Sequence, residues 1–300
     1  MVDVFSPTAL HGSRILVTGG GSGLGRAIAL HLAGHGAEVH VWGRRRAPLE
    51  ETAAAIRAAG GSAFLQTVDV RRADQVDEAV QQLWDRHGPL TGVVNSAAAN
   101  FVARTEDLSP RAFDAVTSTV MHGSYFVTTA AGRRWIADGL PGAVVSLLTS
   151  WVWTGSAFTV PSAMAKAAVH AMTLSLAVEW ARHGIRLNAV APGPVPTEFA
   201  WDVLDPGDGG GASRPPVATE AEGVPAGRHG TPEEVANLVL FLLSDACTYL
   251  TGDTIAMDGG QRLAGPGTFA GLSALTGEDW AALRERGTRA AAASKAERSV

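Results

Sequence analysis

The chain has 300 residues, of which 46% are hydrophobic and 18% are charged, and its formal net charge is −5. These values predict a large core and give no general attraction to nucleic acid or to an anionic membrane. Cys247 is the single cysteine, so an internal disulfide is excluded. No stretch approaches the roughly 20 apolar residues that span a bilayer, and the N-terminal segment lacks a signal-peptide pattern. We therefore expect a cytoplasmic protein without a membrane partner.

Strand and helix patterns alternate along most of the chain. The predicted strands are Arg14–Thr18, Glu38–Trp42, Ser62–Val68, Leu90–Asn95, Gly142–Leu148, Ile185–Ala191 and Asp253–Met257. The predicted helices are Leu24–Gly34, Ala47–Gly60, Ala73–His87, Pro110–Ala137, Ser162–His183 and Thr231–Ser244. Such alternation is typical of a parallel sheet covered by helices on both faces. We therefore predict a single α/β domain of the Rossmann type, with a doubly wound sheet of seven parallel strands.

The domain is expected to cover residues 1–262. Within it, residues 201–227 are rich in Gly, Pro and Asp and predict a loop that closes over a substrate. The last predicted helix carries its own start signal, because Thr231, Pro232 and Glu234 have the spacing of a capping box. Residues 263–300 form a C-terminal extension with an amphipathic pattern near Asp279–Leu283 and a polar, alanine-rich end that we expect to be partly disordered.

The segment RILVTGGGSGLGRAIALHL, residues 14–32, gives the clearest functional signal. Unpaired N–H groups at the start of a helix, together with the helix dipole, bind phosphate. Glycine leaves room where a β-carbon would collide with a ligand or with the sheet. A Gly-rich string can also be a plain tight turn, but the order of strand, turn and helix predicts a dinucleotide site. The contacts assigned to this turn are Gly19, Ser22, Gly23, Leu24 and Gly25.

The end of the second strand indicates which dinucleotide binds. An NAD site usually has an acidic residue there, which bonds the ribose hydroxyls. Here the strand ends VHVWGRRR, so Gly43 stands near the place of the acid and three arginines follow. A guanidinium matches a 2′-phosphate in charge and geometry. We therefore predict NADP(H), with its 2′-phosphate bound by Arg44 and secondarily by Arg45. The alternative is that the arginines are only solvent-exposed residues at the start of the next helix.

Several motifs in order resemble the short-chain dehydrogenase/reductase family over residues 12–262. They are TGGGSGLG at Thr18–Gly25, VDV at Val68–Val70, NSAA at Asn95–Ala98, the helix lysine Lys166, and APGPVPT at Ala191–Thr197. The resemblance implies that Asp69 faces the adenine and that Thr197 reaches the carboxamide end of the nicotinamide. The other cofactor contacts that it implies are Val70, Asn95, Ser96, Ala97, Lys166, Pro192, Gly193 and Val195.

A narrower likeness points to the 2,4-dienoyl-CoA reductase branch, with the trans-2-enoyl-CoA reductases as a less close group. It rests on NSAAANFVARTEDLSPRAF, SAFTVPSAMAKAAVHAMTLSLAVEW and RHGTPEEVANLVLFLLSDA. Both groups reduce carbon–carbon double bonds of acyl-CoA thioesters with NADPH, as part of fatty acid metabolism. The likeness implies an acyl-CoA substrate and a homotetramer. The tetramer would form through the helices beginning near Pro110 and Ser162 and through the last strand.

The catalytic pattern departs from the family at one position. Carbonyl-reducing relatives carry a tyrosine four residues before the lysine, and its phenol acts as acid or base. In this chain Ser162 stands there, and Thr149 lies near the usual catalytic serine as a weak candidate. Mitochondrial-type dienoyl-CoA reductases share the serine and lysine, and use an asparagine that Asn100 matches. Their tyrosine corresponds to Trp151, and the aspartate of the peroxisomal type corresponds to Val120.

These departures leave a route for reducing a conjugated thioester. We assign catalysis to Asn100 and Trp151 as N–H donors to the thioester oxygen, and to Lys166 and Ser162 as holders of a protonating water. Each residue also has a plainer reading as a turn cap, a helix cap or a packing residue. The alternatives are a family enzyme that acts on another small carbonyl or alcohol, and an NADP-binding homologue without catalysis. The nine histidines show no metal-ligand spacing with acidic partners, so no metal is expected.

Overall fold

The computed structural model describes residues 4–100, 102–197, 221–265 and 276–278. Its centre is a sheet of seven strands in the order β3-β2-β1-β4-β5-β6-β7, and every neighbouring pair is parallel. The strand order reverses between β1 and β4, which is the switch point where ligands of such sheets bind. The strands are β1 Arg14–Thr18, β2 Glu38–Gly43, β3 Ser62–Thr67, β4 Gly92–Asn95, β5 Gly142–Leu147, β6 Ile185–Pro192 and β7 Thr254–Met257.

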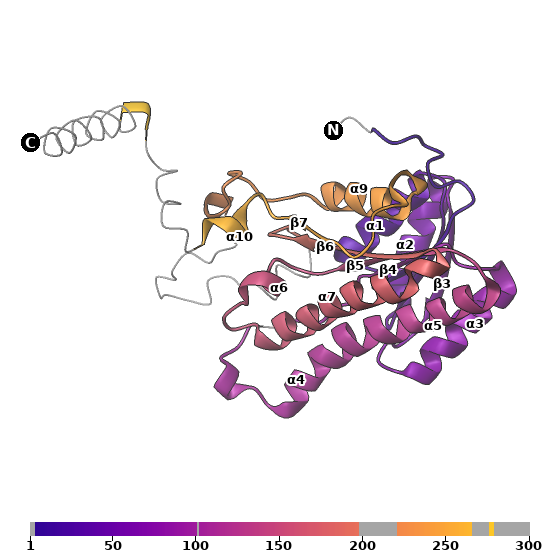
Figure 1. The fold of residues 1–300 in the computed structure, drawn as a ribbon, viewed down its shortest axis with the longest axis horizontal. Coiled ribbons are helices and arrows are strands. Elements are labelled where there is room, and N and C mark those ends of the chain that lie inside the picture. The colour runs from indigo at the N-terminus through magenta and orange to yellow at the C-terminus, as the bar shows by residue number, and fades with distance from the viewer. Residues whose placement is uncertain (1–3, 101, 198–220, 266–275, 279–300) are drawn as a thin grey trace, which may run out of the picture. The chain divides into compact units, whose positions relative to one another are not determined.

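Helices cover both faces of the sheet (Figure 1). The longer ones are α1 Gly23–Gly34, α2 Arg46–Ala58, α3 Ala73–His87, α4 Pro110–Thr117, α5 Gly123–Asp138, α7 Val160–Trp180 and α9 Pro232–Leu243. One apolar core joins α1, α2 and α9 to the sheet, and a second joins α3, α5 and α7 to it. The predicted doubly wound α/β fold of seven parallel strands is therefore confirmed.

The prediction of one helix over Pro110–Ala137 is corrected by the structure. A π-helical turn, Ser118–His122, separates α4 from α5. Its first and last residues, Ser118 and His122, have helical φ and ψ angles, so the turn continues α4 into α5 without a break. One residue is added to that turn while the apolar spacing on either side stays helical, which is why the sequence pattern did not reveal it. A short helix, α6 Trp151–Thr154, also lies where no element was predicted.

The capping box at the start of α9 is present as predicted. Thr231 Oγ1 accepts a hydrogen bond from the backbone N–H of Glu234 at 3.3 Å, and the Glu234 carboxylate accepts one from the Thr231 N–H at 2.9 Å. This reciprocal pair satisfies two donors that the first turn of a helix leaves unpaired. It fixes where α9 begins, and α9 in turn packs against α1.

The chain divides into two units, residues 1–262 and residues 263–300. The first unit contains the whole sheet and all the helices described above. A last short helix, α10 Gln261–Ala264, spans the boundary. Residues 201–220 of the predicted substrate loop, and the pattern at Asp279–Leu283, lie outside the described residues. Within the described part of the chain, no helix has both the length and the apolarity needed to cross a bilayer.

Candidate active site

The glycine turn after β1 lies against the chain that leaves β4. Gly19 has a φ of +68°, and a β-carbon there would stand 3.0 Å from the backbone nitrogen of Ala97. A β-carbon on Gly25 would stand only 2.3 Å from the carbonyl oxygen of Gly19. Both positions therefore require glycine, because the backbone itself leaves no room for a side chain. The close approach makes a backbone cradle between β1 and the start of α1.

Thr18 joins these two segments. It is the last residue of β1 and is buried, and its Oγ1 accepts hydrogen bonds from the N–H groups of Ser96 and Ala97, both at 3.1 Å. The same hydroxyl donates to the carbonyl oxygen of Val94 at 3.3 Å. The bonds hold Ser96 and Ala97 beside the glycine turn. Sequence reasoning did not assign Thr18 a role, although a polar residue ending an apolar strand was a signal for one.

A cavity of about 160 Å³ opens beside the cradle. Seven of the predicted cofactor residues line it together: Gly19, Ser22, Arg44, Arg45, Asp69, Val70 and Ala97. The cavity therefore brings the turn after β1, the arginines after β2 and the segment after β3 to one place. Pro48, Leu49 and Thr119 line it as well and were not predicted.

The carboxylate of Asp69 lines this cavity and forms an ion pair with Arg71. The Arg71 guanidinium bonds its carboxylate, with Nη2 at 2.6 Å from Oδ2. This bond holds the pKa of Asp69 below its usual value, and the charge of Arg44 adds a smaller effect in the same direction. The backbone N–H of Asp69 donates to the Gln75 side chain at 2.7 Å. The carboxylate is thus fixed in its ionised form near Arg44.

The chain after β6 also approaches the glycine turn. Thr197 Oγ1 is 3.5 Å from the place where a β-carbon of Gly23 would stand, so these two predicted residues are neighbours. Gly193 donates its N–H to the carbonyl of Met257 at 3.0 Å, and a β-carbon on Gly193 would stand 2.8 Å from the α-carbon of Asp258. Val195 is buried in the core beside Gly230, so its side chain supports the segment.

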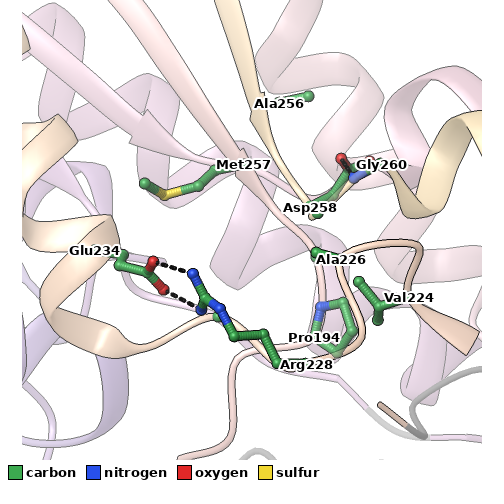
Figure 2. Close-up of a pocket in the computed structure, with 12 residues that line it drawn as sticks. Pro194, Val224, Ala226, Arg228, Glu234, Ala256, Met257, Asp258 and Gly260 are labelled. Atoms are coloured by element: carbon green, nitrogen blue, oxygen red, sulfur yellow. Dashed lines mark hydrogen bonds and ion pairs between the residues drawn. The ribbon is translucent and has the colours of Figure 1, made fainter. Parts of the chain in front are cut away.

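A second cavity, of about 230 Å³, lies between this segment, the end of β7 and residues 224–230 (Figure 2). The Arg228 guanidinium bonds both carboxylate oxygens of Glu234, at 2.7 and 2.9 Å. That pairing, more than any other contact, lowers the pKa of Glu234 to about 2. The cavity shares Gly193 with the predicted cofactor residues but contains no predicted catalytic residue. Sequence reasoning did not foresee it.

Lys166 is the buried cation of the site. Its Nζ donates a hydrogen bond to the carbonyl oxygen of Leu147, at the carboxyl end of β5. Burial lowers the pKa of Lys166 to about 8. Ser162 lies one helical turn earlier on α7 and is also buried. The hydroxyl of Thr159, just before α7, is buried and has no hydrogen-bond partner among the described residues. It could therefore bond a ligand or a water.

A small apolar cluster connects the segments that carry the catalytic candidates. It is formed by Val116, Val120, Leu148, Ala165, Val169, Ala189 and Ala191, with Ala99, Met121, Val152 and Met172 packed against it. Ala99 precedes Asn100, Val152 follows Trp151, and Ala165 precedes Lys166. The structure thus gathers the segments of all four predicted catalytic residues at the carboxyl end of β5. Val120, which stands at the position of the peroxisomal-type aspartate, is buried in this cluster and offers no acidic group.

The loop before α7 contains one residue with an unusual backbone conformation. Phe158 has a φ of +63°, the only positive φ of a non-glycine residue in the described ranges. Its carbonyl accepts a hydrogen bond from the N–H of Ala103 at 2.9 Å. A bulky residue in this conformation is strained and persists only where its surroundings hold it. The bond ties the chain after Asn100 to the loop before α7.

Three other predicted residues have mainly structural contacts. Asn95 is buried, and its side-chain N–H group donates to the hydroxyls of Thr128 at 2.9 Å and Ser146 at 3.3 Å, which ties β4 to α5 and β5. Thr149 is half-buried, and its carbonyl accepts from Val152. Pro192 ends β6 beside Met257. Trp153, by contrast, is 43% exposed and stacks under the Arg262 guanidinium.

Comparison with known proteins agrees with this architecture. A family model described as enoyl-(acyl carrier protein) reductase matches residues 19–262. The chain belongs to the short-chain dehydrogenase/reductase family. A Caenorhabditis elegans protein named "Probable 2,4-dienoyl-CoA reductase 3" is 41% identical over 88% of this chain and 84% of its own length. A Bacillus subtilis protein named "Probable 2,4-dienoyl-CoA reductase" is 39% identical over 83% of this chain and 96% of its own.

Solved structures of this short-chain dehydrogenase/reductase family superpose on the chain. A short chain dehydrogenase from Bacillus anthracis has a TM-score of 0.76 and 36% identity, and the match covers 84% of this chain and 97% of that one. A gluconate 5-dehydrogenase from Burkholderia cenocepacia, solved with NADP and tartrate, has a TM-score of 0.77 and 28% identity over 85% and 97%. The resemblance to the dienoyl-CoA reductase branch is confirmed, and the chain is an oxidoreductase of this family.

Proposed function

We propose that the protein uses NADPH to reduce a carbon–carbon double bond of an unsaturated acyl-CoA, a 2,4-dienoyl-CoA or a trans-2-enoyl-CoA. The observation that carries the proposal is the pair of Lys166 and Ser162, both buried, one turn apart on α7 and without the tyrosine of carbonyl reductases. The names of the relatives at 39–41% identity support the same reaction. A substrate of this kind places the protein in fatty acid metabolism.

The residues of the cofactor site suit nicotinamide adenine dinucleotide phosphate. The cradle at Gly19 and Gly25 has no room for β-carbons, and it opens into the cavity that Arg44 and Arg45 line. Gly43 at the end of β2 offers no carboxylate to the ribose, while the arginines offer charge to a 2′-phosphate. When bound, NADPH supplies the hydride that reduces the substrate. The solved relative that contains NADP supports the same choice.

The side chains of the site manage charge and protons. A conjugated thioester that accepts hydride at carbon gains negative charge on its oxygen, so donors aimed at that oxygen lower the barrier. We assign this role to the Asn100 amide and the Trp151 indole N–H. A second carbon of the substrate then takes a proton, which we assign to a water held by Lys166 and Ser162. The ammonium of Lys166 also binds the ribose hydroxyls of the cofactor in this proposal.

Reduction of another small carbonyl substrate is the second candidate. It is favoured by the likeness to the gluconate 5-dehydrogenase. We rank it lower because the hydroxyl of Ser162 has a far higher pKa than the phenol that stands there in carbonyl-reducing relatives. An NADP-binding homologue without catalysis is the third candidate, and the buried Lys166 argues against it, since burying an ammonium costs stability.

The test is NADPH oxidation by the purified protein with four substrates: a 2,4-dienoyl-CoA, a trans-2-enoyl-CoA, the matching free acid and a 5-keto sugar acid. We expect turnover with a CoA ester and none with the free acid or the keto acid. Lys166→Ala and Asn100→Ala are expected to lower kcat/KM at least tenfold, while Ser175→Ala, an exposed serine on α7, leaves it unchanged. Turnover of the keto acid alone, or unchanged rates in both site variants, would reject the proposal.

We also propose that the protein works as a cytoplasmic homotetramer. Several apolar side chains are exposed on α5 and α7, namely Tyr125 at 49%, Met164 at 53%, Leu174 at 43% and Val178 at 82%. Association of copies through these helices would remove that apolar surface from water. Sedimentation analysis should give a mass four times that of the chain. Val178→Glu should lower this mass, and a monomer in the unmodified protein would contradict the proposal.

A further inference from the structure

A cluster of ionisable side chains lies far from the cofactor residues along β2. Glu38 is the first residue of β2 and His40 the third, while Gly43 and Arg44 lie at the other end of the strand. His87 is the last residue of α3. Because all strands run parallel, Glu38 and His40 lie at the amino edge of the sheet, opposite the glycine turn. The cluster is therefore separate from the site described above.

The three side chains converge. One carboxylate oxygen and two imidazole nitrogens, one from each residue, all lie within 4.8 Å of one another. His40 Nε2 is 2.9 Å from Glu38 Oε1, and the rings of His40 and His87 meet at 71° with centroids 4.8 Å apart. His40 is only 4% exposed. We propose that Glu38, His40 and His87 form a binding site for one divalent ion of the zinc class.

The donor set selects the ion. Two imidazole nitrogens and one carboxylate suit Zn²⁺ and its neighbours, whereas Mg²⁺ and Ca²⁺ prefer oxygen ligands alone. Zinc bonds of about 2.0–2.2 Å place tetrahedral ligand atoms roughly 3.4 Å apart. His40 Nε2 and Glu38 Oε1, 2.9 Å apart, must therefore separate slightly, while a pair as far apart as 4.8 Å must close by roughly 1.4 Å. His87 is partly exposed at a helix end and can rotate to do so. A water would complete the coordination.

Neighbouring side chains hold these ligands in place. Arg14 Nε donates to Glu38 Oε1 at 2.7 Å, and Arg14 Nη1 donates to the carbonyl of Pro89, two residues after His87, at 2.8 Å. The arginine thus ties the carboxylate to the chain that follows the second histidine. Supporting bonds of this kind orient ligands before an ion arrives. The Arg14 charge also weakens cation binding, so we expect lower affinity than in a four-ligand structural zinc site.

Phe64 shields the two histidines. Its ring stacks on His40 at 5.1 Å and 20°, and its centroid is 4.1 Å from that of His87. Phe64 is 36% exposed on the edge strand β3, so it stands between the imidazoles and water. A partly dry surrounding strengthens the bond of an ion to its ligands. The competing interpretation is a plain ion pair of Arg14, Glu38 and His40, which needs no contribution from His87.

The experiment is isothermal titration of the tag-free protein with ZnCl₂ and, separately, with MgCl₂. We expect one zinc per chain and no response to magnesium. His87→Gln and Glu38→Gln should each weaken zinc binding at least tenfold, and His11→Gln, at an exposed histidine, should leave it unchanged. No saturable zinc binding, or equal affinity in the unmodified protein and His87→Gln, would overturn the proposal.

Thermal melting gives a second readout. An ion that binds the folded state alone raises the melting temperature. Zinc should raise it in the unmodified protein and in His11→Gln, but not in His87→Gln. Because His87 is partly exposed, that variant is expected to fold, and it decides the question even if Glu38→Gln does not. An equal zinc-dependent rise in His87→Gln would refute the site. This test does not involve NADPH or acyl-CoA, so its result is independent of the proposed reaction.

Discussion

Lys166 and Leu147 are joined by a hydrogen bond from the lysine Nζ to the backbone carbonyl that ends β5. The bond ties the buried ammonium to the carboxyl edge of the sheet, the edge at which the glycine turn and the loop after β6 also lie. A carbonyl oxygen satisfies one of the three ammonium donors and leaves the others for water or a ribose. The position of Lys166 therefore depends on the sheet as well as on α7.

The first prediction concerns pH. Burial lowers the pKa of Lys166 from 10.5 to about 8, so the ammonium required by the proposed reaction is lost above about pH 8. We expect kcat/KM to fall above that pH. Between pH 8 and 10.5 the unfolded chain binds more protons at this lysine than the folded one, so this group makes stability rise with pH there. Chemical denaturation from pH 7 to 10 checks the slope. Lys166→Met should reduce it, and an unchanged slope would be inconsistent with the lowered pKa.

The second prediction concerns cofactor choice. Arg44→Ala removes a guanidinium from the cavity proposed to hold the 2′-phosphate. Loss of a charge-assisted bond of about 1.5–3 kcal/mol corresponds to a roughly 10- to 100-fold weaker affinity for NADPH. Affinity for NADH should change little. Fluorescence titration of both cofactors measures this. Arg46→Ala is the matched control, because Arg46 is exposed and pairs with Glu50. Equal losses for NADPH and NADH would contradict the assignment.

The third prediction concerns the glycine cradle. Gly25→Ala puts a β-carbon 2.3 Å from the carbonyl oxygen of Gly19, so backbone must move and dinucleotide binding should be lost. The melting temperature should also fall. Gly34→Ala, at the other end of α1, meets nothing within 4 Å and should leave both properties intact. Retained NADPH binding in Gly25→Ala would show that the turn tolerates a side chain.

The fourth prediction concerns the capping box of α9. Thr231→Ala removes the acceptor of the Glu234 N–H and should lower the free energy of unfolding by about 1 kcal/mol. Thr231→Ser keeps the hydroxyl and should recover most of that loss. Chemical denaturation measures both variants. A fully stable Thr231→Ala protein would mean that packing of α9 on α1, and not the cap, fixes the start of the helix.

The sequence was sufficient for the sheet because most strands are apolar runs placed between helix patterns, and the more polar edge strand β3 also lies between two such patterns. It was also sufficient for the cap at Thr231, because that signal lies within four residues. The π turn at Ser118–His122 was missed because it leaves the apolar spacing helical. The cavity beside Arg228 and Glu234 was missed because its lining comes from segments far apart in the chain.

The same reason explains the histidine cluster. Glu38 and His40 alternate on one strand, but His87 follows 47 positions after His40, so no ligand spacing was visible. Only the packing of α3 beside β2 brings it near. Conversely, Arg44 was assigned from the end of the second strand, and Asp69 and Ala97 from the family resemblance, and all three line one cavity. A motif of neighbouring residues can be recognised in the sequence, whereas contacts between distant residues depend on how the elements pack.

The most direct measurement follows the hydrogen atoms of the reaction. The protein is incubated with NADPH carrying deuterium at the transferred position and, in parallel samples, with a 2,4-dienoyl-CoA or a carbonyl substrate, and the products are analysed by mass spectrometry. The account predicts an enoyl-CoA that has gained two hydrogens, one of them deuterium on carbon. Recovery of the dienoyl-CoA unchanged, while deuterium enters the alcohol product of a carbonyl substrate, would contradict it.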